Sequence, residues 1–202
     1  MINSKSIAPK LLGVFSIFWV LLAISPLYRD IWVAENLILF VCIYYLLTTY
    51  KRFKFSNTSY YLIFIFCILQ TIGAHYTYAE VPFGFWMADL FDWQRNHYDR
   101  LVHFAFGFLI ILPFKEVLIK TLRFANYKTE VFVLVFLFIG IGASYEIVEW
   151  WYAIIYEQES QTSNTFLGSQ GDIWDAEKDV LLSGLGAWLY LLVFNPKSTN
   201  KV

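Results

Sequence analysis

The chain has few charged residues and almost no cysteine. Asp, Glu, Lys and Arg make up 15% of its 202 residues, against about 25% in a typical soluble domain, and 58% of the residues are hydrophobic. The two cysteines, Cys42 and Cys67, both lie inside apolar segments, where neither thiol is placed as an activated nucleophile. Two cysteines also exclude a disulfide scaffold. This composition indicates a membrane protein.

The signatures of several common enzyme classes are absent as well. The sequence contains no HExxH, GxSxG, GxGxxG or CxxC motif and no Walker-type glycine loop. Basic residues occur only in short loop clusters, so we expect no nucleic-acid partner. Any chemistry must come from residues outside these motifs.

Long apolar runs are abundant instead. Six segments are long enough to span a bilayer: about 11–28, 31–50, 59–78, 100–120, 131–155 and 176–194. We predict an all-α polytopic membrane protein in which residues 1–202 form a single domain, a bundle of six transmembrane helices.

Two shorter features qualify this prediction. Lys5 and Lys10 precede the first run as they would in a signal peptide, but the run is long enough to span and Pro26 follows its weak cleavage site, so we expect an uncleaved first helix. Residues 81–96 are too polar to span. They are expected to form a short interfacial or re-entrant helix, or else a structured loop.

The charges are distributed unequally between the two sides of the predicted bundle. With the N-terminus in the cytoplasm, the inner side carries 11 of the 15 Lys and Arg but 2 of the 16 Asp and Glu. The positive-inside rule therefore predicts that both termini are cytoplasmic. All three histidines and most carboxylates then lie on the outer side.

Three groups of ionisable residues lie near the predicted outer ends of the last three segments. Within each group, spacings of three or four residues place side chains on one helix face. Ionisable residues inside membrane segments are candidates for a functional site. The groups are Asp99, Arg100 and His103; Glu146 and Glu149; and Asp172, Asp175 and Asp179.

Carboxylates held this close together need compensation, and three kinds are available. Arg100 is a built-in ion-pair partner, one carboxyl can be protonated, or a divalent cation can bind. Carboxylates with an occasional imidazole suit Mg²⁺, Ca²⁺ or Mn²⁺, and Zn²⁺ if histidine takes part. Asp172 and Asp175 also have a purely structural explanation, because a helix N-terminus favours negative charge.

Three sequence blocks, Tyr98–Gly107, Tyr145–Trp151 and Gly171–Asp179, resemble the YjdF-type family of bacterial inner-membrane proteins. The resemblance covers the third to sixth segments. It implies a multi-pass helical protein of the bacterial inner membrane, and it brings no established activity.

A fainter similarity is to VanZ-like proteins, which carry an Asp/His pair, a later Glu and an Asp before a glycine-bearing helix. The matching positions are Asp99, His103, Glu149, Asp175 or Asp179, and Gly184. VanZ-like proteins are linked to glycopeptide-antibiotic tolerance, so this similarity implies envelope substrates. The asparagine and basic residues of that pattern have no clear counterpart in this chain.

Three functions are compatible with these observations. The first is an enzyme acting on a lipid-linked or envelope small molecule, with a divalent cation such as Mg²⁺, Mn²⁺ or Zn²⁺. In it Glu146 or Asp99 would be a general base and Arg100 would contact a phosphate or carboxylate. The second is a proton- or cation-coupled transporter or lipid-moving protein, and the third is a non-catalytic membrane partner with structural ion pairs. The cation ligands in the first are His103, Glu149, Asp175 and Asp179.

Overall fold

The computed structural model describes residues 6–156 and 169–194. These residues contain helices and no strand. Four of the helices, α2, α3, α5 and α6, are long and apolar enough to cross a membrane. The chain is therefore a polytopic helical membrane protein. Its helices are α1 (Ala8–Leu22), α2 (Arg29–Thr49), α3 (Asn57–Tyr76), the 3-10 helix η1 (Tyr78–Glu80), α4 (Pro82–Phe91), α5 (Tyr98–Thr121), α6 (Tyr127–Tyr156) and α8 (Asp175–Phe194).

Each predicted apolar segment contains a helix, although some bounds differ and α1, with 15 residues, is shorter than the candidate spans. The first helix ends at Leu22 instead of about residue 28. Ser25 has a positive φ of 51°, and Pro26 follows it, so a helix cannot continue through this turn. For residues 81–96 the short-helix prediction is confirmed, because α4 occupies Pro82–Phe91.

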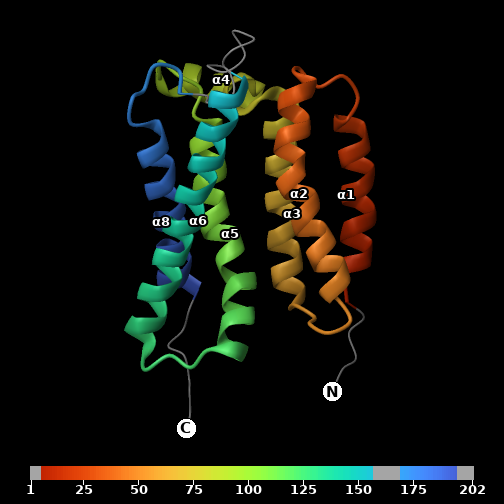
Figure 1. Cartoon of the computed structure of the whole chain (residues 1–202), viewed down its shortest axis with the longest axis vertical. Helices are drawn as coiled ribbons and strands as arrows, with labels where there is room; N and C mark the ends of the chain where they lie inside the picture. Colours follow the sequence, from red (N-terminus) through yellow and green to blue (C-terminus); the bar gives the residue numbers. More distant parts are fainter. Residues whose placement is uncertain (1–5, 157–168, 195–202) are drawn as a thin grey trace.

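The long helices form two groups of three that stand side by side (Figure 1). One group holds α1, α2 and α3, and the other holds α5, α6 and α8. The two groups meet where α3 packs against α5, and the most extensive contact in the molecule is between α5 and α8. The short helix α4 lies across one end of the bundle, called here the α4 end (Figure 1). The described chain starts and finishes at the opposite end.

Small residues allow α5 and α8 to approach closely. A Cβ atom at Gly107 would lie 1.9 Å from the carbonyl oxygen of Ser183, and one at Gly186 would lie 2.2 Å from that of Phe104. Neither position can therefore carry a side chain without moving a backbone. Gly186 therefore has a packing role, whereas at Gly140 a Cβ would meet nothing within 4 Å.

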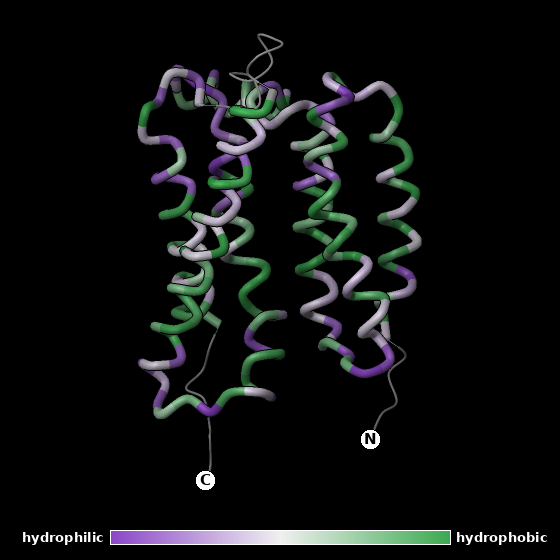
Figure 2. Tube along the Cα trace, viewed as in Figure 1, coloured by the Kyte–Doolittle hydropathy of each residue, from purple (hydrophilic) through white to green (hydrophobic). Residues whose placement is uncertain are grey.

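The half of the bundle away from the α4 end is filled by a purely apolar core. Its centre is formed by Ile111, Leu134, Phe138 and Leu191, all fully buried between α5, α6 and α8. Figure 2 shows hydrophobic residues along the middle of the helices and polar residues mainly toward their ends. The core separates the polar groups of the α4 end from those of the opposite end.

The two carboxylates at that opposite end have structural partners. Glu130, which is 2% exposed, forms an ion pair with Lys115 at 2.7 Å between Nζ and Oε1. Glu116 accepts hydrogen bonds from the Ser59 hydroxyl at 2.7 Å and from the Ser56 backbone N–H at 3.0 Å. The Glu116 contacts tie the start of α3 to α5, and the Glu130–Lys115 pair ties α6 to α5. These contacts account for both carboxylates without a functional role.

Candidate functional site

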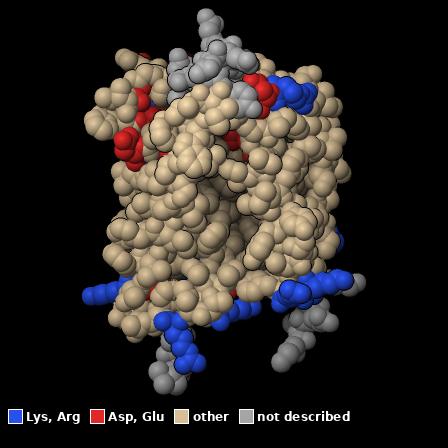
Figure 3. Space-filling view, in the orientation of Figure 1, with Lys and Arg blue, Asp and Glu red and all other residues tan. Residues whose placement is uncertain are grey.

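Acidic side chains gather at the α4 end, and most Lys and Arg side chains lie at the opposite end (Figure 3). The candidate site is at the α4 end, where α5, α6 and α8 meet. It has two layers. The layer nearer the end of the bundle joins two arginines and a lysine to two aspartates, and the layer beneath it holds further carboxylates and one histidine.

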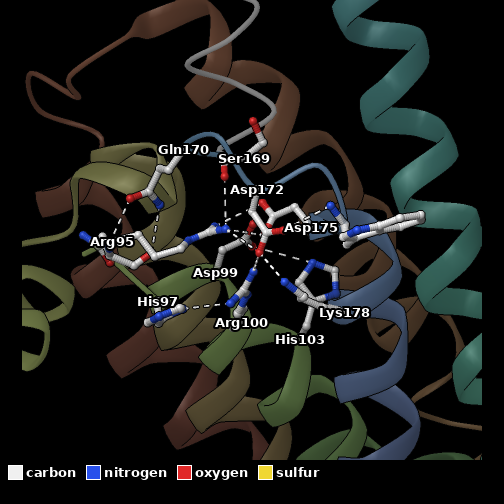
Figure 4. Close-up of polar contacts among 12 residues, drawn as sticks. Arg95, His97, Asp99, Arg100, His103, Ser169, Gln170, Asp172, Asp175 and Lys178 are labelled. Carbon is white, nitrogen blue, oxygen red and sulfur yellow. Dashed lines mark hydrogen bonds and ion pairs between the residues drawn. The ribbon is translucent and has the colours of Figure 1, made fainter. Parts of the chain in front are cut away.

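The first layer is an arginine–aspartate network of five residues: Arg95, Arg100, Asp172, Asp175 and Lys178 (Figure 4). Its central member is Asp175, in the first turn of α8. Arg95 holds this carboxylate with two hydrogen bonds, from Nη1 at 2.6 Å and from Nη2 at 3.1 Å, and Arg100 adds a third from Nη2 at 2.9 Å. Bidentate guanidinium–carboxylate pairs of this kind are strong and directional.

Asp172 is the second anion of the network. Its Oδ2 accepts from Arg100 Nη2 and from Lys178 Nζ, both at 2.5 Å, and its Oδ1 accepts from the Trp174 backbone N–H at 3.1 Å. The hydrogen bonds from Lys178 and Arg100 hold the pKa of Asp172 well below its usual range. Asp172 is therefore ionised at any physiological pH.

His97 completes the surroundings of Arg100. Its Nδ1 lies 3.3 Å from Arg100 Nη1, and its ring packs edge-on against Trp93. Burial and the nearby Arg100 charge lower the pKa of His97. Because a guanidinium only donates hydrogen bonds, this contact requires a neutral His97 with the proton on Nε2.

Backbone contacts fix the loop that carries Arg95. The side chain of Gln170 donates to the Asn96 carbonyl at 2.8 Å and accepts from the Asn96 N–H at 2.9 Å. The Asn96 side chain donates to the Val81 carbonyl at 2.9 Å and accepts from the Tyr98 N–H at 3.0 Å. Asn96 is 1% exposed and thus joins α4, the start of α5 and the residues before α8.

The second layer is a histidine–aspartate cluster formed by Asp99 and His103 of α5 with Asp179 of α8. These residues are 9%, 7% and 2% exposed, and each offers one ligand atom within 4.8 Å of the others. His103 Nε2 lies 3.6 Å from Asp99 Oδ1, as their four-residue spacing predicted. Asp179 Oδ1 is buried and has no hydrogen-bond partner among the described residues.

Three further side chains border this cluster. Glu146 of α6 places Oε1 3.3 Å from His103 Nε2, and the Ser183 hydroxyl lies 3.4 Å from His103 Nδ1. Glu149, one turn along α6, is 7% exposed and lies close enough to Glu146 and Asp179 to interact with them electrostatically. The cluster therefore collects acidic groups from three helices around one imidazole.

A buried glutamate from the other group of helices reaches the same region. Glu35 of α2 is 4% exposed, and its Oε2 accepts from Tyr145 at 2.7 Å and from Tyr78 and Gln70 at 3.3 Å each. Tyr145 also packs edge-on against the His103 ring. Glu35 thus connects α2 and α3 to the cluster through Tyr145.

The predicted site residues divide between the two layers. Asp99, His103, Glu146, Glu149 and Asp179 lie together in the second layer. Arg100 and Asp175 lie in the first, where they pair with each other. The predicted roles of all seven as base, substrate contact or cation ligand stay predictions.

Sequence reasoning missed three contributors. Arg95 lies outside the three predicted groups, although it makes the bidentate contact with Asp175. Tyr145 directly precedes Glu146 at the start of the block Tyr145–Trp151, and that position was the available signal. Glu35 also lies outside the predicted groups, and its polarity inside an apolar segment was the signal that could have found it.

The chain matches the family described as "Predicted membrane protein (DUF2238)" over residues 8–199. It is 35% identical over 156 residues to a protein of Escherichia coli (strain K12) named "Inner membrane protein YjdF", and the match covers 77% of this chain and 73% of that protein. No solved structure matches the chain. With its apolar helices, these matches indicate a multi-pass inner-membrane protein. The chain belongs to this YjdF (DUF2238) family of membrane proteins, as its three sequence blocks predicted.

Proposed function

We propose that the chain is an inner-membrane enzyme whose histidine–aspartate cluster binds a divalent cation and acts on a lipid-linked or envelope small molecule. The observation that carries this proposal is the convergence of Asp99, His103 and Asp179, three buried ligand groups from two helices within 4.8 Å. A buried carboxylate oxygen without a partner is costly, and Asp179 Oδ1 is such an atom among the described residues.

The donor set favours particular metals. Two carboxylates and one imidazole suit Mn²⁺, Mg²⁺ or Zn²⁺, which bind oxygen and nitrogen at about 2.0–2.2 Å. Ligands around one such ion lie about 3–4 Å apart, so this cluster needs only a small contraction to hold it. Glu146 and Glu149 are the nearest further carboxylates.

The roles follow from the positions of the side chains. Glu146, beside His103, would act as general base toward a water whose acidity a cation held by the cluster would increase. Asp99 is the alternative base, as a member of the cluster itself. Asp175 is left out of the ligand set, because both of its oxygens accept hydrogen bonds from arginines.

The proposal includes a topology of six spans with both termini in the cytoplasm and the site facing outward. Besides the four apolar candidates, α1 and α8 stand alongside them in the same bundle (Figure 1). The excess of Lys and Arg at the end opposite α4 supports a cytoplasmic position for that end.

Cysteines introduced singly at Lys178 and Lys128 test this topology, in a chain with Cys42 and Cys67 changed to alanine. An impermeant maleimide should label position 178 in intact spheroplasts and position 128 only after lysis; the reverse pattern would overturn the topology.

Metal content is the direct test of the cluster. We expect near-stoichiometric metal in detergent-purified protein after incubation with Mn²⁺, Mg²⁺ or Zn²⁺, and its loss in His103→Gln and Asp179→Asn. Asp30→Asn is the control, since Asp30 is an exposed carboxylate in the first turn of α2 and belongs to neither layer. Loss of metal in all three variants, or none in the wild type, would contradict the site.

The reaction itself needs a separate experiment. The metal-loaded protein is incubated with an inner-membrane lipid extract, and lipids and water-soluble products are compared by mass spectrometry with those from Asp179→Asn. A product formed only by the wild type supports an enzyme. Bound metal without any product would leave a cation-binding protein with no catalytic role.

A proton- or cation-coupled transporter or lipid-moving protein is the second candidate. It requires a polar path across the bilayer, and the apolar core around Ile111, Phe138 and Leu191 lies between the cluster and the far end of α5, α6 and α8. We therefore rank it below the enzyme. Cation flux in proteoliposomes that is lost in Glu149→Gln would reverse this order.

A further inference from the structure

We infer that a groove between α4, α5 and α8 binds the head group of an anionic phospholipid from the surrounding bilayer. The groove has a volume of about 620 Å³, which lies within the range of about 300–1,000 Å³ that is typical of ligand sites. It lies on the side of α5 and α8 that carries Arg100 and Lys178. The inference does not depend on cation binding by the histidine–aspartate cluster.

The lining of the groove is amphipathic. Its charged residues are both cationic, Arg100 and Lys178, and they stand at the end of the groove where α5 and α8 begin. The remaining wall is largely apolar and includes Leu101, Phe104 and Leu181. A lipid has a phosphate at one end and acyl chains at the other, so it matches a groove with a cationic end and an apolar wall.

The cationic end retains capacity for a phosphate. Lys178 has three N–H donors, is 46% exposed, and gives one short contact to Asp172. Arg100 contacts the carboxylates of Asp172 and Asp175 and Lys178 contacts that of Asp172, but no carboxylate of the described residues lines the groove itself. His97, the third polar residue of the lining, adds no opposing charge in its neutral form.

The α4 wall is fixed in place, so the groove does not depend on a ligand to form. A Cβ at Gly84 would lie 1.7 Å from the side-chain oxygen of Asn96, which shows how closely α4 sits on that residue. Asn96 in turn donates to the Val81 carbonyl at the start of α4. Exposed Phe83 and Trp93 flank the opening, as aromatic side chains do at a lipid head-group boundary.

Native mass spectrometry of delipidated full-length protein tests the inference, with phosphatidylglycerol and phosphatidylcholine as probes. We expect one phosphatidylglycerol to bind more tightly than phosphatidylcholine. Lys178→Gln should weaken that binding about fivefold, as expected for one cation near a lipid surface. Arg29→Gln removes a cation from the start of α2, away from the groove, and should leave binding unchanged.

A second pair of variants tests the apolar wall without touching a charge. Leu181→Trp fills the groove at an exposed position and should abolish tight binding, whereas Leu185→Trp, one turn along α8 and outside the lining, should not. Equal binding of the two lipids, or equal loss in each variant and its control, would overturn the inference. Metal content measured on the same samples separates this outcome from a failure of the cation site.

Discussion

Asp175→Asn should be among the most destabilising single changes in the chain. Asp175 is 7% exposed and accepts three hydrogen bonds from two guanidinium groups, two from Arg95 and one from Arg100. The asparagine is nearly isosteric but neutral. It removes one of the two carboxylate charges of the arginine–aspartate network, which holds three cations.

The expected magnitude follows from this burial. Removing one partner of a buried ion pair costs about 3–5 kcal/mol, because the other charge is left without compensation. For a domain of this size, each kcal/mol corresponds to about 2–4 °C in Tm, so the loss should be roughly 6–20 °C. Asp30→Asn, at an exposed carboxylate in the first turn of α2, should stay within about 0.5 kcal/mol.

Thermal unfolding of detergent-purified protein, followed by size-exclusion chromatography of heated samples, measures these shifts. A double-mutant cycle with Arg95→Gln identifies the cause, since the double variant should lose much less than the two single losses combined. A Tm for Asp175→Asn within about 2 °C of the wild-type Tm, instead of roughly 6–20 °C below it, would refute the reasoning. Strict additivity in the cycle would refute the pairing itself.

Two further predictions concern packing and pH. Gly186→Ala should destabilise by about 1–3 kcal/mol, because its Cβ would meet the Phe104 carbonyl at 2.2 Å, whereas Gly140→Ala should be neutral or stabilising in the same unfolding assay. The pKa of His97 is lower in the folded chain than its ordinary value of 6.5, so the unfolded chain binds the proton first as pH falls. The free energy of unfolding of the wild type should therefore decrease as pH drops from about 7 through 6.5 towards the lower folded pKa. Tm measured against pH should show this fall in wild type and not in His97→Gln; an identical pH profile would contradict it.

Much of the helical framework was predictable because a bilayer makes strong demands on sequence. Runs of about 20 apolar residues mark helices whatever their neighbours, and the structure has a helix in every predicted segment, although that in the first has 15 residues. The first helix ends early because the turn at Ser25 and Pro26 is a local backbone effect that hydropathy ignores. Its apolar residues beyond Leu22 continue the run without continuing the helix.

Part of the site was predictable for a similar reason, since helical spacing alone places Asp99 and His103 on one face. The partners across helices were not. Arg95 meets Asp175 across 80 positions, and Glu35 meets Tyr145 across 110. These contacts depend on how α3 packs on α5 and how closely α5 approaches α8, which charge and hydropathy patterns do not specify.

The close contact between α5 and α8 makes the two layers of the site interdependent. Asp175 and Asp179 are four residues apart on α8, while Asp99 and Arg100 are adjacent on α5, so the network that aligns the helix ends also sets the spacing of the cluster beneath it. Asp175→Asn should then weaken Mn²⁺ binding about 10–100-fold, as the loss of an orienting group does, whereas Asp179→Asn should abolish it. Mn²⁺ titrations followed by the rise in Tm separate the two effects at temperatures where both variants are folded. If Asp175→Asn abolishes Mn²⁺ binding as completely as Asp179→Asn does, Asp175 is itself a cation ligand, as the sequence predicted.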